Sequence, residues 1–223
     1  MTTIPRVKIC CISSVEEARI AVECGAAALG LVGHMPSGPG VISDELIGDI
    51  VKTVPPPVAT FLLTSETNPA AIIAHHKKVY ASVIQIVDAL AERQYDILRQ
   101  ELPAVKLVQV IHVTDERSVT EAIEISQHVD AILLDSGNPN LAVKELGGTG
   151  RTHNWDLSRT IRESIDIPLY LAGGLNKDNV RQAIDKVQPF GIDLCSGVRT
   201  NGKLDAAKLQ AFFAAIHNRE IVR

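Results

Sequence analysis

Short, almost continuously apolar runs alternate along the chain with longer segments in which apolar residues recur at helical spacing. The short runs predict buried β-strands, and the longer segments predict amphipathic helices. The predicted strands are residues 6–12, 27–32, 58–63, 82–87, 105–113, 131–135, 168–172 and 192–195. The predicted helices are residues 14–24, 43–54, 69–79, 91–102, 117–129, 155–165, 178–187 and 206–217.

Strict alternation of strands and helices indicates a parallel sheet covered by helices. These strand–helix pairs in 223 residues predict a compact α/β fold, the eight-stranded parallel (β/α)8 or TIM barrel. A doubly wound sheet would have about five or six strands and a glycine-rich turn after the first one. Residues 11–14 stand there instead and contain no glycine. Because no linker-like segment interrupts the chain, we expect residues 1–223 to form a single domain.

The composition is that of an ordinary soluble globular protein, with 46% apolar and 22% charged residues. The formal net charge of -4 argues against nucleic acid or an anionic membrane as the main partner. No signal peptide and no apolar run of bilayer length is evident. The four cysteines lack the spacing of a disulfide framework or a zinc site, so we expect a cytoplasmic protein without a bound metal.

Glycine-rich loops follow the last three predicted strands, at the end of the barrel where active sites lie. Their candidate phosphate-binding residues are Gly148, Gly150, Gly173, Gly174, Ser196 and Gly197. Backbone N–H groups in such loops approach an anion closely, because glycine has no Cβ atom. Taken alone, the loop after strand seven and the loop after strand eight each also fit a tight turn. Taken together, the two loops match the usual phosphate site of these barrels. The loop after strand six is not a P-loop, and we assign it to the same site.

Reactive side chains also stand at predicted strand ends. Asp135 ends the sixth strand, where it fits either a chemical role or a hydrogen-bond acceptor that orders the loop. Cys10 on its own also fits a small buried apolar residue. Strand alternation places Lys8 and Cys10 on one face, which we expect to be the barrel mouth, and Ile9 and Cys11 on the other. A thiol beside a cation ionises more readily and can act as a base.

Together these motifs resemble the phosphoribosylanthranilate isomerase family of tryptophan biosynthesis, over nearly the whole chain. The resembling stretches are residues 7–10, 28–32, 84–85, 133–136, 147–152 with Trp155, 171–176, 179–180, 191–193 and 196–198. The resemblance implies that Cys10 is a general base and Asp135 a general acid, and that the glycine loops hold a ribose phosphate. It also implies a cofactor-free Amadori rearrangement of N-(5-phosphoribosyl)anthranilate to the 1-deoxyribulose 5-phosphate ketose. Such an enzyme is an intramolecular oxidoreductase, here an aldose–ketose isomerase of aromatic amino-acid biosynthesis.

The chain also departs from the pattern of this family. The family carries a Ser-Pro-Arg run after strand two whose arginine binds the anthranilate carboxylate, and Gly40 stands in place of that arginine. A bidentate arginine–carboxylate pair is hard to replace. We assign substrate binding to Lys8, His34, Gln85 and Arg199, with His34 or Arg199 as the substitute for the missing arginine. Cys11 stands where the family has a glycine, and Cys195 where it has a serine.

Three functions are therefore open at the level of the sequence. The first is phosphoribosylanthranilate isomerase with a rebuilt carboxylate site. The second is a paralogue that isomerises another phosphorylated sugar or amino-sugar, and the third is a non-catalytic barrel that binds a phosphorylated ligand. Retention of Cys10 and Asp135 argues against the third, since a binder needs neither. In each case the partner is a phosphorylated sugar, and the sequence leaves monomer and homodimer open.

Overall fold

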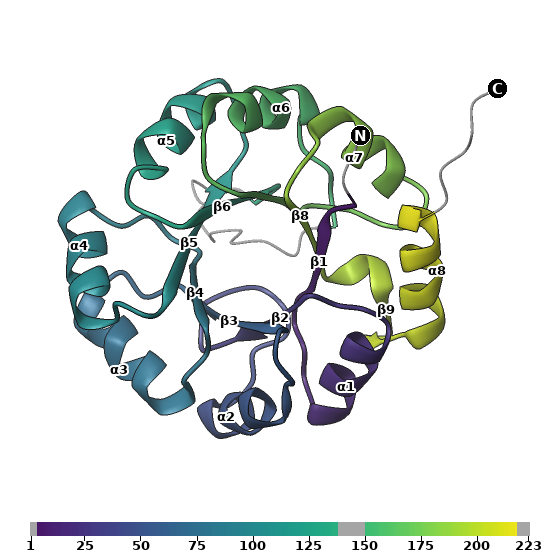
Figure 1. The fold of residues 1–223 in the computed structure, drawn as a ribbon, viewed down its shortest axis with the longest axis horizontal. Coiled ribbons are helices and arrows are strands. Elements are labelled where there is room, and N and C mark those ends of the chain that lie inside the picture. Colours follow the sequence, from purple (N-terminus) through teal and green to yellow (C-terminus); the bar gives the residue numbers. More distant parts are fainter. Residues whose placement is uncertain (1–3, 138–149, 218–223) are drawn as a thin grey trace.

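The computed structural model describes residues 4–137 and 150–217, and it shows a closed barrel of parallel strands inside a ring of helices (Figure 1). The strands follow one another around the barrel in sequence order, and β1 pairs with β8 to close it. They are β1 (Arg6–Ile9), β2 (Ala28–Val32), β3 (Ala59–Thr64), β4 (Val83–Ile86), β5 (Lys106–His112), β6 (Ala131–Asp135), β7 (Leu169–Leu171) and β8 (Gly191–Leu194). The predicted TIM barrel is confirmed.

The helices lie on the outside of the barrel and run between successive strands (Figure 1). They are α1 (Val15–Glu23), α2 (Asp44–Thr53), α3 (Pro69–Val79), α4 (Glu92–Glu101), α5 (Arg117–Ile125), α6 (Trp155–Ser164), α7 (Val180–Val187) and α8 (Ala206–His217). No helix in these described ranges is long and apolar enough to cross a membrane.

Local sequence signals set where several helices begin. The side chains of Ser14, Ser43, Asn68 and Asn154 each accept a hydrogen bond from a first-turn amide, in α1, α2, α3 and α6 respectively. Such a cap satisfies an amide that has no partner within the helix. These four helices accordingly begin within one residue of the predicted positions.

The apolar side chains of the strands divide between two layers. Ile9 and Leu29 belong to the layer between the sheet and the helices, while Val108 and Leu133 fill the barrel interior. Alternate residues of a strand point to opposite faces, so strands buried on both faces have continuous apolar sequences. The interior layer also contains Cys10, which lies directly after β1.

The structure adds elements between β8 and α8 that the sequence pattern did not predict. A short 3-10 helix, η1 (Ser196–Val198), leads into an antiparallel hairpin of β9 (Arg199–Thr200) and β10 (Lys203–Leu204). Elements of two or three residues are too short to carry a periodic signal. Two predicted ends differ by three residues or more: β1 ends at Ile9 rather than at residue 12, and α5 ends at Ile125 rather than at residue 129.

Candidate active site

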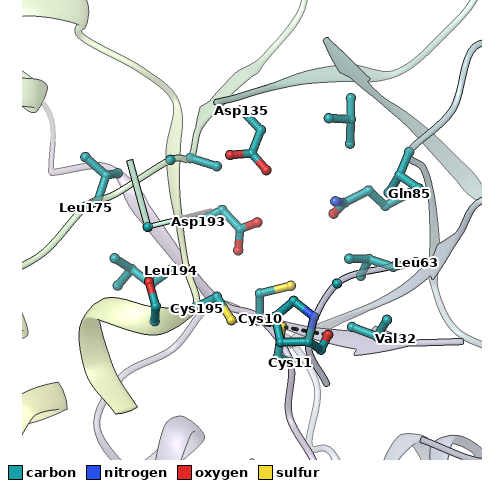
Figure 2. Close-up of a pocket in the computed structure, with 18 of the residues that line it drawn as sticks. Cys10, Cys11, Val32, Leu63, Gln85, Asp135, Leu175, Asp193, Leu194 and Cys195 are labelled. Atoms are coloured by element: carbon teal, nitrogen blue, oxygen red, sulfur yellow. Dashed lines mark hydrogen bonds between the residues drawn. The ribbon is translucent and has the colours of Figure 1, made fainter. Parts of the chain in front are cut away.

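A pocket opens at the carboxyl ends of the barrel strands, where active sites of this fold lie (Figure 2). Of the residues predicted from the sequence, those that line it are Cys10, Gln85, Asp135, Gly150, Gly173, Gly174 and Ser196. The remaining predicted residues in the described ranges, which do not line it, are Lys8, His34, Gly197 and Arg199. Gly148 lies outside the described residues.

Lys8 and Cys10 lie on the same face of the chain at β1, as predicted. A Cβ atom on Gly30 of β2 would lie 2.7 Å from Cys10 Sγ and 3.1 Å from Lys8 Nζ, so both side chains pack against that glycine. Lys8 is fully buried, donates to Asp193 Oδ2 at 2.8 Å, and lies 5.2 Å from the centre of the Phe61 ring. These contacts offset the cost of burying its charge. Lys8 therefore lies inside the barrel beneath the pocket, and not at the mouth as predicted.

Asp135 ends β6, and its carboxyl group reaches the pocket. Burial raises the pKa of this carboxyl above its ordinary value, because the charged form loses its hydration. The Ser136 amide donates to Oδ1 at 2.7 Å and opposes part of the shift. Asp135 is thus held in one position in an environment that favours its protonated form, which is what a general acid requires.

Two buried oxygens in the pocket have no hydrogen-bond partner among the described residues: Gln85 Oε1 and Asp193 Oδ1. Both side chains line the pocket, and they point into the same space as Asp135 (Figure 2). An unpaired buried oxygen costs about 1–3 kcal/mol, so a ligand rich in hydroxyl groups would satisfy both. Asp193 was not among the site residues predicted from the sequence. The available signal was a carboxyl group inside the apolar strand β8, the same signal that indicated Asp135.

The glycine loops of the predicted phosphate site pack against one another. A Cβ atom on Gly174 would lie 2.6 Å from the carbonyl carbon of Arg151, and one on Gly197 would lie 2.2 Å from the carbonyl oxygen of Leu175. Only glycine permits these approaches of backbone to backbone. The loop at residues 150–152, the loop after β7 and the loop after β8 therefore form one cluster, and Ser196 lines the pocket beside it. Loops of this kind present backbone N–H groups that suit an anion.

Neither Arg199 nor His34 is among the residues that line the pocket. The Arg199 guanidinium pairs with Glu17 of α1 at 3.1 Å and donates to the carbonyl groups of Cys10 and Cys11. His34 is exposed in the loop after β2. Substrate binding by either residue stays a prediction, and this geometry does not support it.

Cys11 lies on the pocket side, so the prediction that it shares the helix-facing side with Ile9 is wrong. Its φ of 61° ends the strand alternation after Cys10 and turns the side chain inward. Cys11 Sγ lies 2.9 Å from Cys195 Sγ, and it donates to the Pro39 carbonyl at 3.5 Å. Three cysteines from two neighbouring strand ends therefore line the pocket.

The loop after β2 leaves no space for a side chain at residue 40. Gly40 has a φ of 83°, and a Cβ atom there would lie 2.4 Å from the Cβ atom of Cys11. An arginine at this position would require a left-handed backbone and a displaced Cys11. No lysine, arginine or histidine is among the described residues that line the pocket. The described ranges also contain no group of three or more His, Cys, Asp or Glu side chains arranged to hold a metal ion.

Comparisons with known proteins agree with this geometry. Residues 7–215 match the family model of N-(5'phosphoribosyl)anthranilate (PRA) isomerase. The N-(5'-phosphoribosyl)anthranilate isomerase of Methanosarcina acetivorans is 32% identical over 95% of this chain and 92% of its own length. The protein of the same name from Haloferax volcanii is 34% identical over 94% of this chain and 92% of its own length.

Solved structures of the same family share the fold. The phosphoribosyl anthranilate isomerase of Thermotoga maritima has a TM-score of 0.80 and 32% identity, covering 95% of this chain and 98% of its own. A phosphoribosyl anthranilate isomerase in complex with reduced 1-(o-carboxyphenylamino)-1-deoxyribulose 5-phosphate has a TM-score of 0.77 and 30% identity over the same shares. The resemblance seen in the sequence motifs is confirmed, and the chain belongs to the N-(5'-phosphoribosyl)anthranilate isomerase family.

Proposed function

We propose that the protein isomerises N-(5'-phosphoribosyl)anthranilate to the 1-deoxyribulose 5-phosphate ketose. The observation that carries the proposal is a pocket with Cys10 and a buried Asp135 at strand ends, beside a cluster of glycine loops. The family match over residues 7–215 supports it, as does the product-like ligand bound in a 30% identical structure.

In this proposal the glycine cluster binds the 5'-phosphate and fixes the sugar across the pocket. Backbone N–H groups near Gly173, Gly174 and Ser196 face the phosphate oxygens. The ribose hydroxyl groups then pair with Gln85 Oε1 and Asp193 Oδ1, the two buried oxygens that have no protein partner in the described ranges. Lys8 holds Asp193 from beneath and does not touch the substrate.

Asp135 starts the chemistry by donating a proton to the furanose ring oxygen. The lone pair of the anthranilate nitrogen forms a double bond to C1 as the C1–O bond breaks, which opens the ring to an iminium ion. Burial raises the pKa of Asp135, which shifts this carboxyl group in the direction that a general acid needs.

Cys10 completes the rearrangement as the base. Its thiolate removes the C2 proton, and the electron pair of that C–H bond moves through C2–C1 to neutralise the iminium nitrogen. The resulting enolamine gains a proton at C1 and loses one from the C2 hydroxyl group, which gives the ketose. The substrate nitrogen serves as the electron sink, so the proposal assigns no cofactor.

The test is turnover of freshly prepared N-(5'-phosphoribosyl)anthranilate, followed by the loss of anthranilate-type fluorescence. We expect Cys10→Ala and Asp135→Asn each to lower turnover by about 10²–10⁴-fold, because each removes one proton transfer. Cys24→Ala, at the end of α1 and outside the pocket, is the matched control and should keep wild-type turnover. A folded Cys10→Ala protein with undiminished activity would refute the assignment of the base.

A second candidate is isomerisation of a related phosphoribosyl amine that lacks the carboxylate. The supporting observation is the pocket lining, whose described residues include no cationic side chain, together with the closed space at Gly40. Comparing kcat/KM for the anthranilate and aniline forms of the substrate separates the two candidates. A higher value for the aniline form would favour the second, and a higher value for the anthranilate form the first.

We further propose that the reaction takes place in the cytoplasm, since all four cysteines are free thiols and reducing compartments keep them so. The proposed site draws every group from one chain, so it is compatible with a monomer or a homodimer.

A further inference from the structure

Two cysteines outside the proposed proton-transfer chemistry meet in the lining of the pocket. Cys11 follows β1 and Cys195 follows β8, the two strands that close the barrel, and their Sγ atoms are 2.9 Å apart (Figure 2). Both side chains line the pocket, so a small reagent that enters it reaches them. A disulfide joins sulfurs about 2.05 Å apart, so these two need to approach by only about 0.9 Å.

We propose that Cys11 and Cys195 form a reversible disulfide, which makes this part of the pocket lining a site of oxidation by peroxides. The thiolate of one cysteine attacks hydrogen peroxide, which breaks the O–O bond, forms a sulfenic acid and releases hydroxide. The thiol of the other cysteine then attacks the sulfenic sulfur, and water leaves as the S–S bond forms. Two thiols and one peroxide thus give one disulfide and two waters, with two electrons passing from sulfur to oxygen.

Cys195 is the cysteine that attacks first. Its hydrogen bond with Cys11 lowers the pKa of the Cys195 thiol, the nearby Arg199 charge lowers it further, and burial opposes both. The hydrogen bonds with Cys10 and Cys195, together with burial, raise the pKa of Cys11, which therefore serves as the resolving thiol. One nucleophilic thiolate beside one resolving thiol is the arrangement that forms disulfides efficiently.

The backbone around the pair is held in place for the reaction. Arg199 donates to the carbonyl groups of Cys10 and Cys11, and its pairing with Glu17 ties this segment to α1. Cys11 already has a left-handed φ of 61°, which directs its side chain toward Cys195.

Oxidation would lower catalytic turnover, and this consequence rests on the proposed function. Cys11 is adjacent to Cys10, the proposed base, and Cys195 is adjacent to Ser196 in the proposed phosphate site. Drawing the two sulfurs together shifts both neighbours, and a displacement of about 1 Å in an active site can lower a rate about 10²-fold.

The experiment treats the purified full-length protein with hydrogen peroxide, blocks free thiols, and maps disulfides by mass spectrometry after trypsin digestion without reduction. The expected product joins peptide 9–19 to peptide 187–199, with two of the four thiols lost and restored by a thiol reductant. Peptide 9–19 contains both Cys10 and Cys11, so Cys11→Gly decides which of them reacts. Glycine suits the left-handed backbone at this position.

We expect no cross-link in Cys11→Gly or in Cys195→Ser, and an undiminished cross-link in Cys24→Ser. Oxidised wild-type protein should turn over substrate about 10²-fold more slowly and recover fully on reduction. A cross-link that persists in Cys11→Gly would overturn the proposal, as would oxidation of Cys10 alone. The cross-link is scored by mass, so it decides the oxidation site whether or not the reduced protein turns over the substrate.

Discussion

A single backbone angle separates the roles of Cys10 and Cys11. Cys10 follows the alternation of β1 and lies on the same face as Lys8, as predicted. The φ of 61° at Cys11 directs the next side chain to the same side. Non-glycine residues adopt this angle rarely, so a periodic pattern has no means of foreseeing it. The position of Cys10 was predictable from the sequence, and that of Cys11 was not.

The buried carboxyl groups give a testable pH dependence. A general acid acts only while protonated, so kcat/KM should fall as pH rises through the pKa of Asp135, which burial raises above 3.8. Asp193→Asn removes a neighbouring negative charge and frees the Lys8 cation, and both changes favour ionised Asp135. The descending limb should therefore move to lower pH in this variant. A pH–rate profile checks the shift, and a limb that stays in place would contradict the role of Asp135.

Helix α1, near the start of the chain, makes hydrogen bonds with residues near the end of the chain. Ser14 caps its first turn, and Glu17 in the same turn accepts hydrogen bonds from the Ser13 amide, the Leu204 amide and Arg199. The cap was predictable because serine followed by glutamate is a local signal. The pairing with Arg199 was not, because it joins residues 182 positions apart.

Glu17→Gln should lower the free energy of unfolding by about 3 kcal/mol at neutral pH, because Arg199 would remain buried without its anionic partner. Burial opposes ionisation of Glu17, but the hydrogen bonds from Arg199, Leu204 and Ser13 outweigh it and lower the pKa below 4.5. A lowered carboxyl pKa stabilises the fold above the unfolded-state value, and this stabilisation is lost as pH falls through the folded-state value.

Urea unfolding of wild type and Glu17→Gln at a series of pH values measures the difference. It should be largest near pH 7 and shrink as pH drops below 4.5. A difference that stays constant with pH would show that the charge of Glu17 is not its source.

The pairing of β1 with β8 closes the barrel and brings together residues of the proposed site from both ends of the chain. It brings Lys8 to Asp193, and it places Cys10 and Cys11 beside Cys195. The proposed base, the buried ion pair and the cysteine pair therefore all depend on contacts between the first and the last strand.

Lys8→Met should lower the free energy of unfolding by about 3–5 kcal/mol, because it leaves Asp193 charged, buried and unpaired. The double variant Lys8→Met/Asp193→Leu should recover most of that stability, since it removes both charges. Thermal unfolding checks both, with Arg19→Gln as the control because its ion pairs are exposed and its loss should change the midpoint little. Equal stability of the single and double variants would contradict this account.

The barrel, most helix starts and the glycine loops of the proposed phosphate site could be predicted from the amino-acid sequence alone. Those features follow from local periodicity, caps and turns, which neighbouring residues set. The sequence also indicated Asp135, because an unpaired carboxyl group at the end of an apolar strand is costly to bury, and Cys10, because Lys8 shares its strand face and the family resemblance implies a base there. Three features became visible only in the folded chain: the pairing of Asp193 with Lys8, the position of Arg199 behind the pocket, and the contact of Cys11 with Cys195. Each of these joins the two ends of the chain, and such contacts exist only once the barrel has closed.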